Sequence, residues 1–285
     1  MDKVYNPRQI VRAGCMSTQL LLSLAAMAGY VAAGMILWHS ARHEPGIQGY
    51  TGVLTATAIG LIFHFSVLYV NPGFNSRLLT ELGPAISTAT FGTALLFLLL
   101  SFRKFAVVLG LVVIPAAIGG LIADLLIPGV VQDHQELKRS AGWHIALALP
   151  TYGILCLAFA QACILWFQEN RLKNPATPDL LPGLPALQSM ESSLQWLILA
   201  GFILMTVNLI SGMISSYADS GRLLLFNHHI ILSIVAWMGF GSLLLGRKTM
   251  GWRGKTAAKW TIATFVVLVL AFFGTRAVQQ LILGE

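Results

Sequence analysis

The sequence predicts an all-α membrane protein, a polytopic bundle of about eight transmembrane helices, and two observations support this fold class. First, 56% of the 285 residues are hydrophobic and only 10% are charged, whereas about 25% charged residues are typical of a soluble domain. Second, apolar runs of roughly 20 residues recur along the chain, long enough to span a bilayer as helices. The runs are uniformly apolar instead of alternating, which favours helices over barrel strands.

The apolar runs place the crossings in order along a single membrane domain, residues 1–285. They are expected at 17–38, 51–70, 84–101, 105–128, 143–168, 194–215, 228–246 and 257–280. The connecting segments are short, and the longest, at about 169–193, is Pro-rich and too short for a soluble domain. The lipid bilayer is therefore an expected partner along the whole chain.

Basic residues in the loops predict the orientation. An even number of crossings puts both termini on one side, and the densest group of Lys and Arg lies between Arg247 and Lys259. Short basic loops stay in the cytoplasm, so we expect both termini on the outer, periplasmic side, with segments 129–142 and 216–227 facing outward. The net charge of +7 is scattered over loops and forms no single stripe, which argues against a nucleic-acid partner.

Three of the seven histidines fall in the outer half of the membrane in this orientation. His144 follows Trp143 at the mouth of the fifth crossing, His228 opens the seventh, and His64 lies beyond the middle of the second. An ionisable group in an apolar helix is costly and is a candidate functional residue by default. His144 and His64 also have an ordinary alternative, because a Trp-His pair anchors helices at the interface and a buried histidine can simply satisfy packing.

Two histidines on separate helices that face an apolar cleft match the requirements of axial haem ligation. A cation at the rim would then meet the propionates, and the candidates are Arg276, Arg139 and Lys138. His228 and His229 are adjacent and point about 100° apart on a helix, so we expect only one of them to face the cleft.

Other chemistries find less support in the sequence. A metal transporter normally adds carboxylates along its path, and the predicted crossings offer only Asp124, which we expect to pair with Arg276 or to extend to the interface. Asn208 is expected to bridge two helices. The sequence has no Walker loop, Rossmann glycine fingerprint or nucleophile constellation, so we expect no enzymatic activity.

Several motifs of the second half recur together in a known family. They are Trp143-His144 with Tyr152, Met190-Glu191, Gly201-Phe202, Gly212, His228, Leu232-Ser-Ile-Val-Ala-Trp237, Leu245-Gly-Arg247, Gly251-Trp-Arg-Gly254 and Phe273-Gly274. The pattern resembles the cytochrome c assembly family, the CcsA/CcmC-type haem-handling membrane proteins, over about residues 55–280 and most strongly from 140 onward. Within it the pattern is most like the YpjD-like inner-membrane branch, which also has an early histidine like His64.

The resemblance implies an eight-helix bundle of the bacterial inner membrane that binds or handles haem at the outer leaflet, with haem b as the expected cofactor. His144 matches the family's external haem-ligand histidine, and His228 matches a histidine common in the YpjD-like branch. Three features depart from the family. The tryptophan-rich loop that should fall near 216–227 contains no tryptophan, Gly246 replaces a frequent histidine, and no histidine follows the last helix.

We therefore expect a non-enzymatic haem-binding membrane protein that acts with a membrane or cytochrome-maturation partner. The expected haem-contacting residues are His144 and His228 as iron ligands, His64 as a third candidate, Trp143 and Arg276. One alternative is a membrane accessory or scaffold protein for a transporter or another membrane partner, which the missing tryptophan loop favours. The other is a HemX-like regulator of tetrapyrrole synthesis with a cytoplasmic partner at the 247–259 loop.

Overall fold

The computed structural model describes residues 7–42, 47–70, 81–102, 104–127, 139–172, 185–221 and 228–274. The elements are α1 (Pro7–Arg42), α2 (Ile47–Val70), α4 (Leu82–Leu100), the 3-10 helix η1 (Lys104–Leu109), α5 (Gly110–Leu126), α6 (Arg139–Leu172), α7 (Leu187–Ser220), α8 (His228–Thr249), α9 (Gly254–Val269) and the π-helical turn η2 (Leu270–Gly274).

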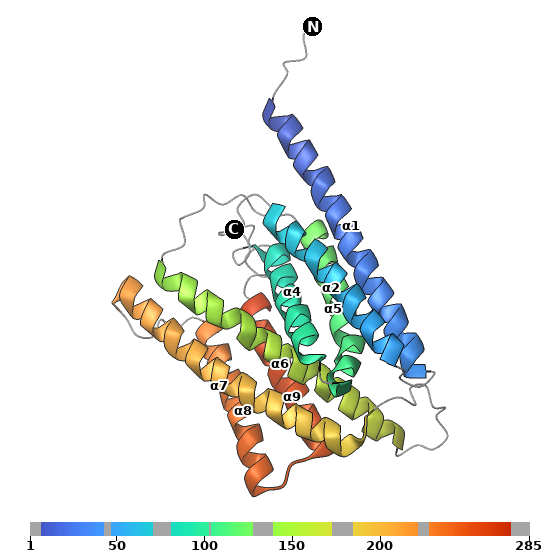
Figure 1. The fold of residues 1–285 in the computed structure, drawn as a ribbon. Helices are drawn as coiled ribbons and strands as arrows, with labels where there is room; N and C mark the ends of the chain where they lie inside the picture. Colours follow the sequence, from blue (N-terminus) through green and yellow to red (C-terminus); the bar gives the residue numbers. More distant parts are fainter. Residues whose placement is uncertain are drawn as a thin grey trace.

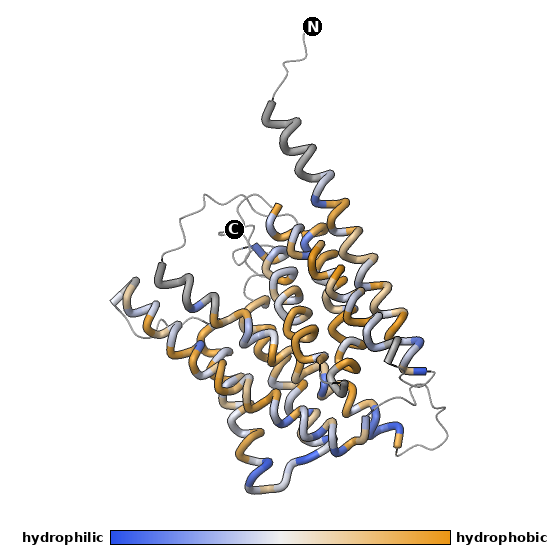
Figure 2. Tube along the Cα trace, in the orientation of Figure 1, coloured by the Kyte–Doolittle hydropathy of each residue, from blue (hydrophilic) through white to orange (hydrophobic). Residues whose placement is uncertain are grey.

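The predicted all-α bundle is confirmed for the described part of the chain. Eight of its helices are long and apolar enough to cross a membrane, and the hydrophilic residues gather at the helix ends (Figure 2). Each of the eight predicted crossings corresponds to one of these helices. The side of the membrane on which the termini lie stays a prediction.

The helices pack as two four-helix groups (Figure 1). In the first group, α1 packs on α2 and α5, and α4 packs on the same two helices. In the second, α6 packs on α7 and α9, and α8 closes the ring by contacting both of these helices. The groups meet mainly where α4 lies against α6, so that one apolar core runs through both.

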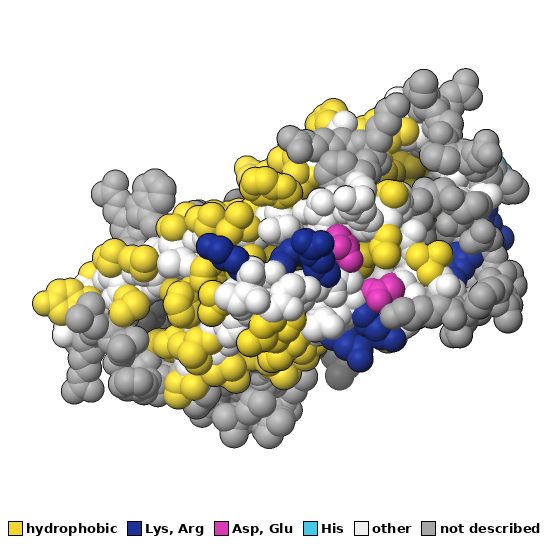
Figure 3. All heavy atoms as spheres, turned by 90° about the horizontal axis from the view of Figure 1, so that it is seen from below, with side chains coloured by type: hydrophobic (Ala, Val, Ile, Leu, Met, Phe, Trp, Pro, Cys, Tyr) yellow, Lys and Arg dark blue, Asp and Glu magenta, His cyan; other side chains and the backbone are white. Residues whose placement is uncertain are grey.

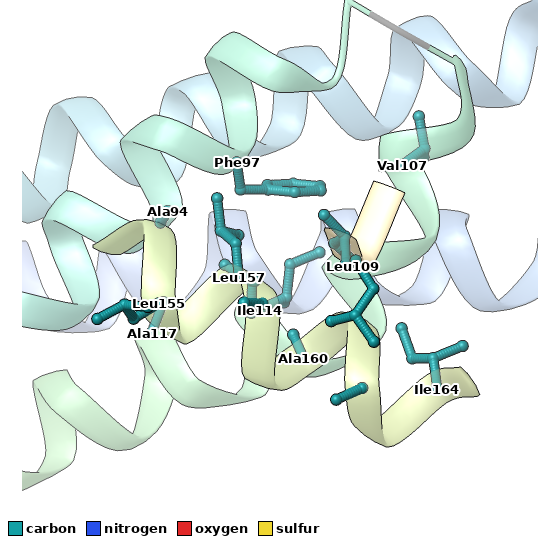
Figure 4. Close-up of a cluster of buried hydrophobic side chains, with 14 of the residues drawn as sticks. Ala94, Phe97, Val107, Leu109, Ile114, Ala117, Leu155, Leu157, Ala160 and Ile164 are labelled. Atoms are coloured by element: carbon teal, nitrogen blue, oxygen red, sulfur yellow. The ribbon is translucent and has the colours of Figure 1, made fainter. Parts of the chain in front are cut away.

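Figure 4 shows this shared core from the side of α6. The ring of Phe97 on α4 lies above Leu157 of α6 and Ile114 of α5, and all three are almost completely buried. Small residues such as Ala117 and Ala160, both without exposed surface, allow the helices to approach closely. In a bilayer such close packing is the main source of helix association, because the lipid tails are as apolar as the side chains.

Helices α6 and α7 are longer than the sequence predicts. Each has 34 residues, or about 51 Å at 1.5 Å per residue. Both are thus longer than a hydrocarbon layer is thick, at about 30 Å, and either tilt within it or extend beyond it. Helix α7 begins inside the expected 169–193 loop because Met190 and Leu194, one turn apart, are both buried. It also continues to Ser220, into the expected outer loop, and ends at Gly221 with a left-handed φ of 67°.

Candidate functional site

A cavity of about 450 Å³ lies inside the second helix group. It is enclosed by α6, α7, α8, the end of α9 and η2, close to the end of the bundle at which α6 begins and α7 ends. We call this end the His144 end. The cavity is lined by His144, Ala148, Thr151, Tyr152, Met205, Thr206, Asn208, Leu209, Ile210, Gly212, Met213, Ser216, Ile230, Ser233, Ile234, Trp237, Leu268 and Phe272.

His144 contributes the cavity's imidazole, from the second turn of α6. Its Nδ1 atom lies 3.1 Å from Oγ of Ser211 on α7. The Ser211 hydroxyl donates to the backbone carbonyl of Asn208 at 2.8 Å, which favours the tautomer in which His144 donates Nδ1–H to Oγ. In the neutral imidazole the lone pair is then on Nε2, the form in which histidine binds a metal.

A glycine on α7 makes room for this imidazole. A Cβ atom added to Gly212 would lie 3.0 Å from Cε1 and 3.3 Å from Nδ1 of His144. The ring therefore rests directly on the α7 backbone, next to its partner Ser211. Gly212 is one of the motif residues, and a larger side chain at this position would collide with the His144 ring.

The wall formed by α8 carries the Ser-Ile-Val-Ala-Trp motif. Ser233, Ile234 and Trp237 line the cavity. The Trp237 indole donates its Nε1 proton to Thr206 Oγ1 at 2.9 Å and stacks on Phe202, with ring centroids 5.4 Å apart and planes at 21°. Because its polar edge is satisfied by α7, the tryptophan gives the cavity a fixed aromatic face.

The aromatic pair Tyr152 and Phe272 forms part of the wall between α6 and η2. The two rings lie 5.3 Å apart, and both line the cavity. Phe272 reaches it from the π-helical turn η2, and such turns often re-aim side chains at functional sites. Motif residues from α6, α7 and α8 thus meet around one space.

His64 lies elsewhere, in the first helix group. It has no exposed surface, its Nδ1 is 3.1 Å from the Tyr30 hydroxyl, and its Nε2 is 3.0 Å from Ser87 Oγ. Gly29 packs on the backbone of Gly60, where an added Cβ would lie 2.8 Å from the amide nitrogen, and this brings Tyr30 beside α2. His64 joins α1, α2 and α4, and it does not line the His144 cavity.

The other expected haem contacts lie at or beyond the limits of the described residues. Helix α8 begins at His228, but the side chains of His228, His229 and Trp143 are not among those described. Arg276 and Lys138 lie outside the described residues, as does the side chain of Arg139.

Asn208 differs from its expected role, whereas the expected pairing of Asp124 with Arg276 falls outside the described residues. The side chain of Asn208 makes no helix-bridging hydrogen bond among the described residues, because its Oδ1 is buried without a partner. Asp124 is 8% exposed and accepts a bond of 3.3 Å from the Gln19 amide. Within the described ranges, no three His, Cys, Asp or Glu side chains gather as in a protein-only metal site.

A second cavity, of about 460 Å³, lies at the opposite end of the bundle, where α6 ends and α9 begins. Glu169, Glu191 and Arg253 line it around Gly254, and Figure 3 shows basic and acidic side chains together on this face. The two carboxylates stand at the N-terminus of α9, where negative charge is favourable. This arrangement ties α6 and α7 to the Gly-Trp-Arg-Gly turn.

Comparison with known proteins places the motifs in context. The chain is 32% identical over 166 residues to the inner membrane protein YpjD of Escherichia coli, covering 58% of this chain and 62% of that protein. It is 28% identical over 137 residues to the protein HemX of Bacillus subtilis, covering 48% and 50%. It is 34% identical over 120 residues to the cytochrome c biogenesis protein CcsA of Prochlorococcus marinus, covering 42% and 37%.

The matched stretches therefore span less than two thirds of each of these relatives. No solved structure matches the chain. The family model for the cytochrome c assembly protein, in contrast, matches residues 24–283, which include every helix from α2 to η2. This multi-pass membrane protein belongs to the cytochrome c assembly protein family.

Proposed function

We propose that the protein binds or handles haem, with haem b as the cofactor, in the inner membrane of a bacterium. The observation that carries the proposal is the position of His144, an imidazole held by Ser211 in the wall of an apolar cavity of about 450 Å³. A role in cytochrome maturation accords with the family and with the CcsA relative's printed name. In this role the side chains bind and orient; they do not catalyse a reaction.

The cavity walls fit a porphyrin in their chemistry. A haem pocket needs an apolar, partly aromatic slot and one or two neutral axial ligands. Trp237, Tyr152 and Phe272 supply aromatic surface, and Met205 and Leu268 supply aliphatic surface. A volume of about 450 Å³ also lies in the usual range for small-molecule sites, roughly 300–1,000 Å³.

We assign the second axial position to His228, which begins α8 at the same end of the bundle as His144. The family resemblance favours this residue. The helix register instead favours His229, because His229 and the cavity residue Ser233 are four positions apart. Each histidine must therefore be replaced separately.

The experiment is a visible absorption spectrum of the purified protein in detergent, before and after titration with haem b. We expect a Soret band whose intensity saturates at one haem per chain. His144→Ala should weaken binding strongly, as should either His228→Ala or His229→Ala. His39→Ala is the matched control, because His39 is exposed at the end of α1, and it should bind as the wild type does.

The proposal fails if the purified protein shows no Soret band after haem is added. It also fails if the triple variant lacking His144, His228 and His229 binds haem as the wild type does. A colourless protein that copurifies stoichiometrically with one membrane partner would instead support the accessory role. The absence of a tryptophan-rich segment around 216–227 is the observation that favours this second candidate.

A further inference from the structure

The His144 cavity has one edge on the outside of the bundle. Ile210 and Met213 of α7 both line the cavity, yet their side chains are 52% and 38% exposed. Other lining residues, such as Met205 and Leu268, are almost completely buried. A side chain that borders a cavity and is also exposed lies at its opening, so Ile210 and Met213 form one edge of a mouth.

The exposed face of α7 at this mouth is a lipid-facing one. Ile203, Val207 and Ile214 are also exposed, and their spacing from Ile210 puts all four side chains on one stripe of the helix. The stripe is entirely aliphatic and lies within the apolar span Leu187–Ala218. Ile210 comes eight residues before the end of this span, or about 12 Å at 1.5 Å per residue. Its exposed surface therefore faces hydrocarbon and not water.

Helix α8 forms the opposite edge of the mouth. Deeper in the bundle α7 and α8 are held together by the bond of 2.9 Å from Trp237 to Thr206. Nearer the His144 end, α8 borders the cavity with Ile234, which is only partly buried, and the next residue along the chain, Val235, is exposed. The mouth therefore lies between α7 and α8, on the His144 side of the Trp237–Thr206 bond, and it opens sideways into the bilayer.

An aliphatic mouth within the hydrocarbon selects what passes through it. Charged and strongly hydrated solutes are costly to bring to this depth, whereas molecules with a large apolar surface partition into it. We propose that the cavity takes up its ligand from the bilayer through the α7–α8 mouth, so that the ligand is an amphiphile already dissolved in the membrane. For the haem-binding function proposed above, on which this identification rests, that ligand is membrane-dissolved haem b. When the cavity holds no such ligand, the mouth admits the acyl chains of the surrounding lipid.

The first test narrows the mouth. Ile210→Trp puts a larger side chain at its edge, and Ile203→Trp is the matched control, because Ile203 is on the same stripe, 54% exposed, and not a cavity residue. The ligand-free full-length proteins are reconstituted in liposomes, haem b is added, and the rise of the Soret band is followed in time. Ile210→Trp should slow this rise by about tenfold, within the range over which association rates vary among variants of one site. Ile203→Trp should keep the wild-type rate, and equal rates in the two variants would overturn the inference.

The second test does not depend on haem. Phosphatidylcholine with a photoreactive diazirine on its acyl chain is included in the liposomes, the ligand-free proteins are irradiated, and mass spectrometry identifies the labelled residues. We expect label on the α6 wall of the cavity, between His144 and Tyr152, in the wild type and in Ile203→Trp, and several-fold less in Ile210→Trp. Equal labelling of this wall in all three proteins, or none in any of them, would overturn the inference. Labelling that follows this pattern in a protein that shows no Soret band with haem would overturn the haem function and leave the lateral mouth in place.

Discussion

His144 and Ser211 are joined across the α6–α7 interface by a hydrogen bond of 3.1 Å between Nδ1 and Oγ. Ser211 also donates to the Asn208 carbonyl at 2.8 Å, an arrangement that favours the tautomer with the proton on Nδ1. The serine therefore favours one tautomer and holds the orientation of the imidazole. In metal sites, removing such a hydrogen-bond partner of a ligating histidine commonly lowers the affinity for the metal by about 10–100-fold.

Ser211→Ala should accordingly weaken haem binding by at least roughly tenfold, with little change in the melting temperature of the ligand-free protein. Haem titration followed at the Soret band measures the affinity. Ser192→Ala is the matched control, because Ser192 is on the same helix, exposed, and bonded only to the Gln188 carbonyl of its own helix. Equal affinities for Ser211→Ala and Ser192→Ala would show that Ser211 does not orient a ligand.

Gly212→Ala should also weaken haem binding, for a steric reason. Its new Cβ would lie 3.0 Å from His144 Cε1, so the imidazole must move away from α7 and from Ser211. Gly119→Ala is the control, since a Cβ added there meets nothing within 4 Å. The same titration checks both variants, and a Gly212→Ala protein with wild-type affinity would contradict the packing described here.

His64→Leu should lower stability and leave haem binding intact. The change removes two buried hydrogen bonds and strands the Tyr30 and Ser87 hydroxyls, at about 1–3 kcal/mol for each group left without a partner. Thermal unfolding in detergent, followed by circular dichroism, measures the loss. Ser66, on the same helix, donates only to the Ile62 carbonyl. Ser66→Ala should therefore leave the stability nearly unchanged. A well-folded His64→Leu protein that no longer binds haem would instead indicate that His64 is a haem ligand.

The placement of His64 illustrates how far the sequence predicts the site. Apolar runs locate each helix and the depth of each residue along it, and they predict that His64 and His144 lie toward the same end of the bundle. They contain no information on which helices are neighbours. The lateral separation of the two histidines follows from close contacts such as Gly29 on Gly60, which only the packed structure reveals.

Ser211 and Asn208 show a second limit to what the sequence predicts about the site. Single serines and asparagines in an apolar run are equally compatible with back-bonding, helix bridging or ligand contact, because the run fixes no helix phase. The motifs include Gly212 and Trp237, whereas the roles of their neighbours follow from the packing of α7 against α6 and α8. The ends of α7 were misjudged for a related reason: residues 187–193 are polar enough to resemble a loop, yet Met190 is buried.

The turn between α8 and α9 gives a last prediction, from two glycines with similar backbones and different surroundings. Gly251 and Gly254 have φ values of 67° and 53°, a region in which other residues are strained by about 1 kcal/mol or more. A Cβ at Gly251 meets nothing within 4 Å, whereas one at Gly254 would lie 2.7 Å from Glu169 Oε2 and 3.3 Å from Glu191 Oε1. Gly251→Ala should thus lower the stability only by the strain of a non-glycine residue at positive φ.

Gly254→Ala should show the backbone cost and also displace both carboxylates from the start of α9, where they interact favourably with the helix dipole. We expect its melting temperature in detergent to fall clearly below that of Gly251→Ala. Haem binding should be the same in both variants, because this turn lies at the end of the bundle opposite His144. Equal melting temperatures would mean that Glu169 and Glu191 can move away at no cost and do not hold α6 and α7 to this turn.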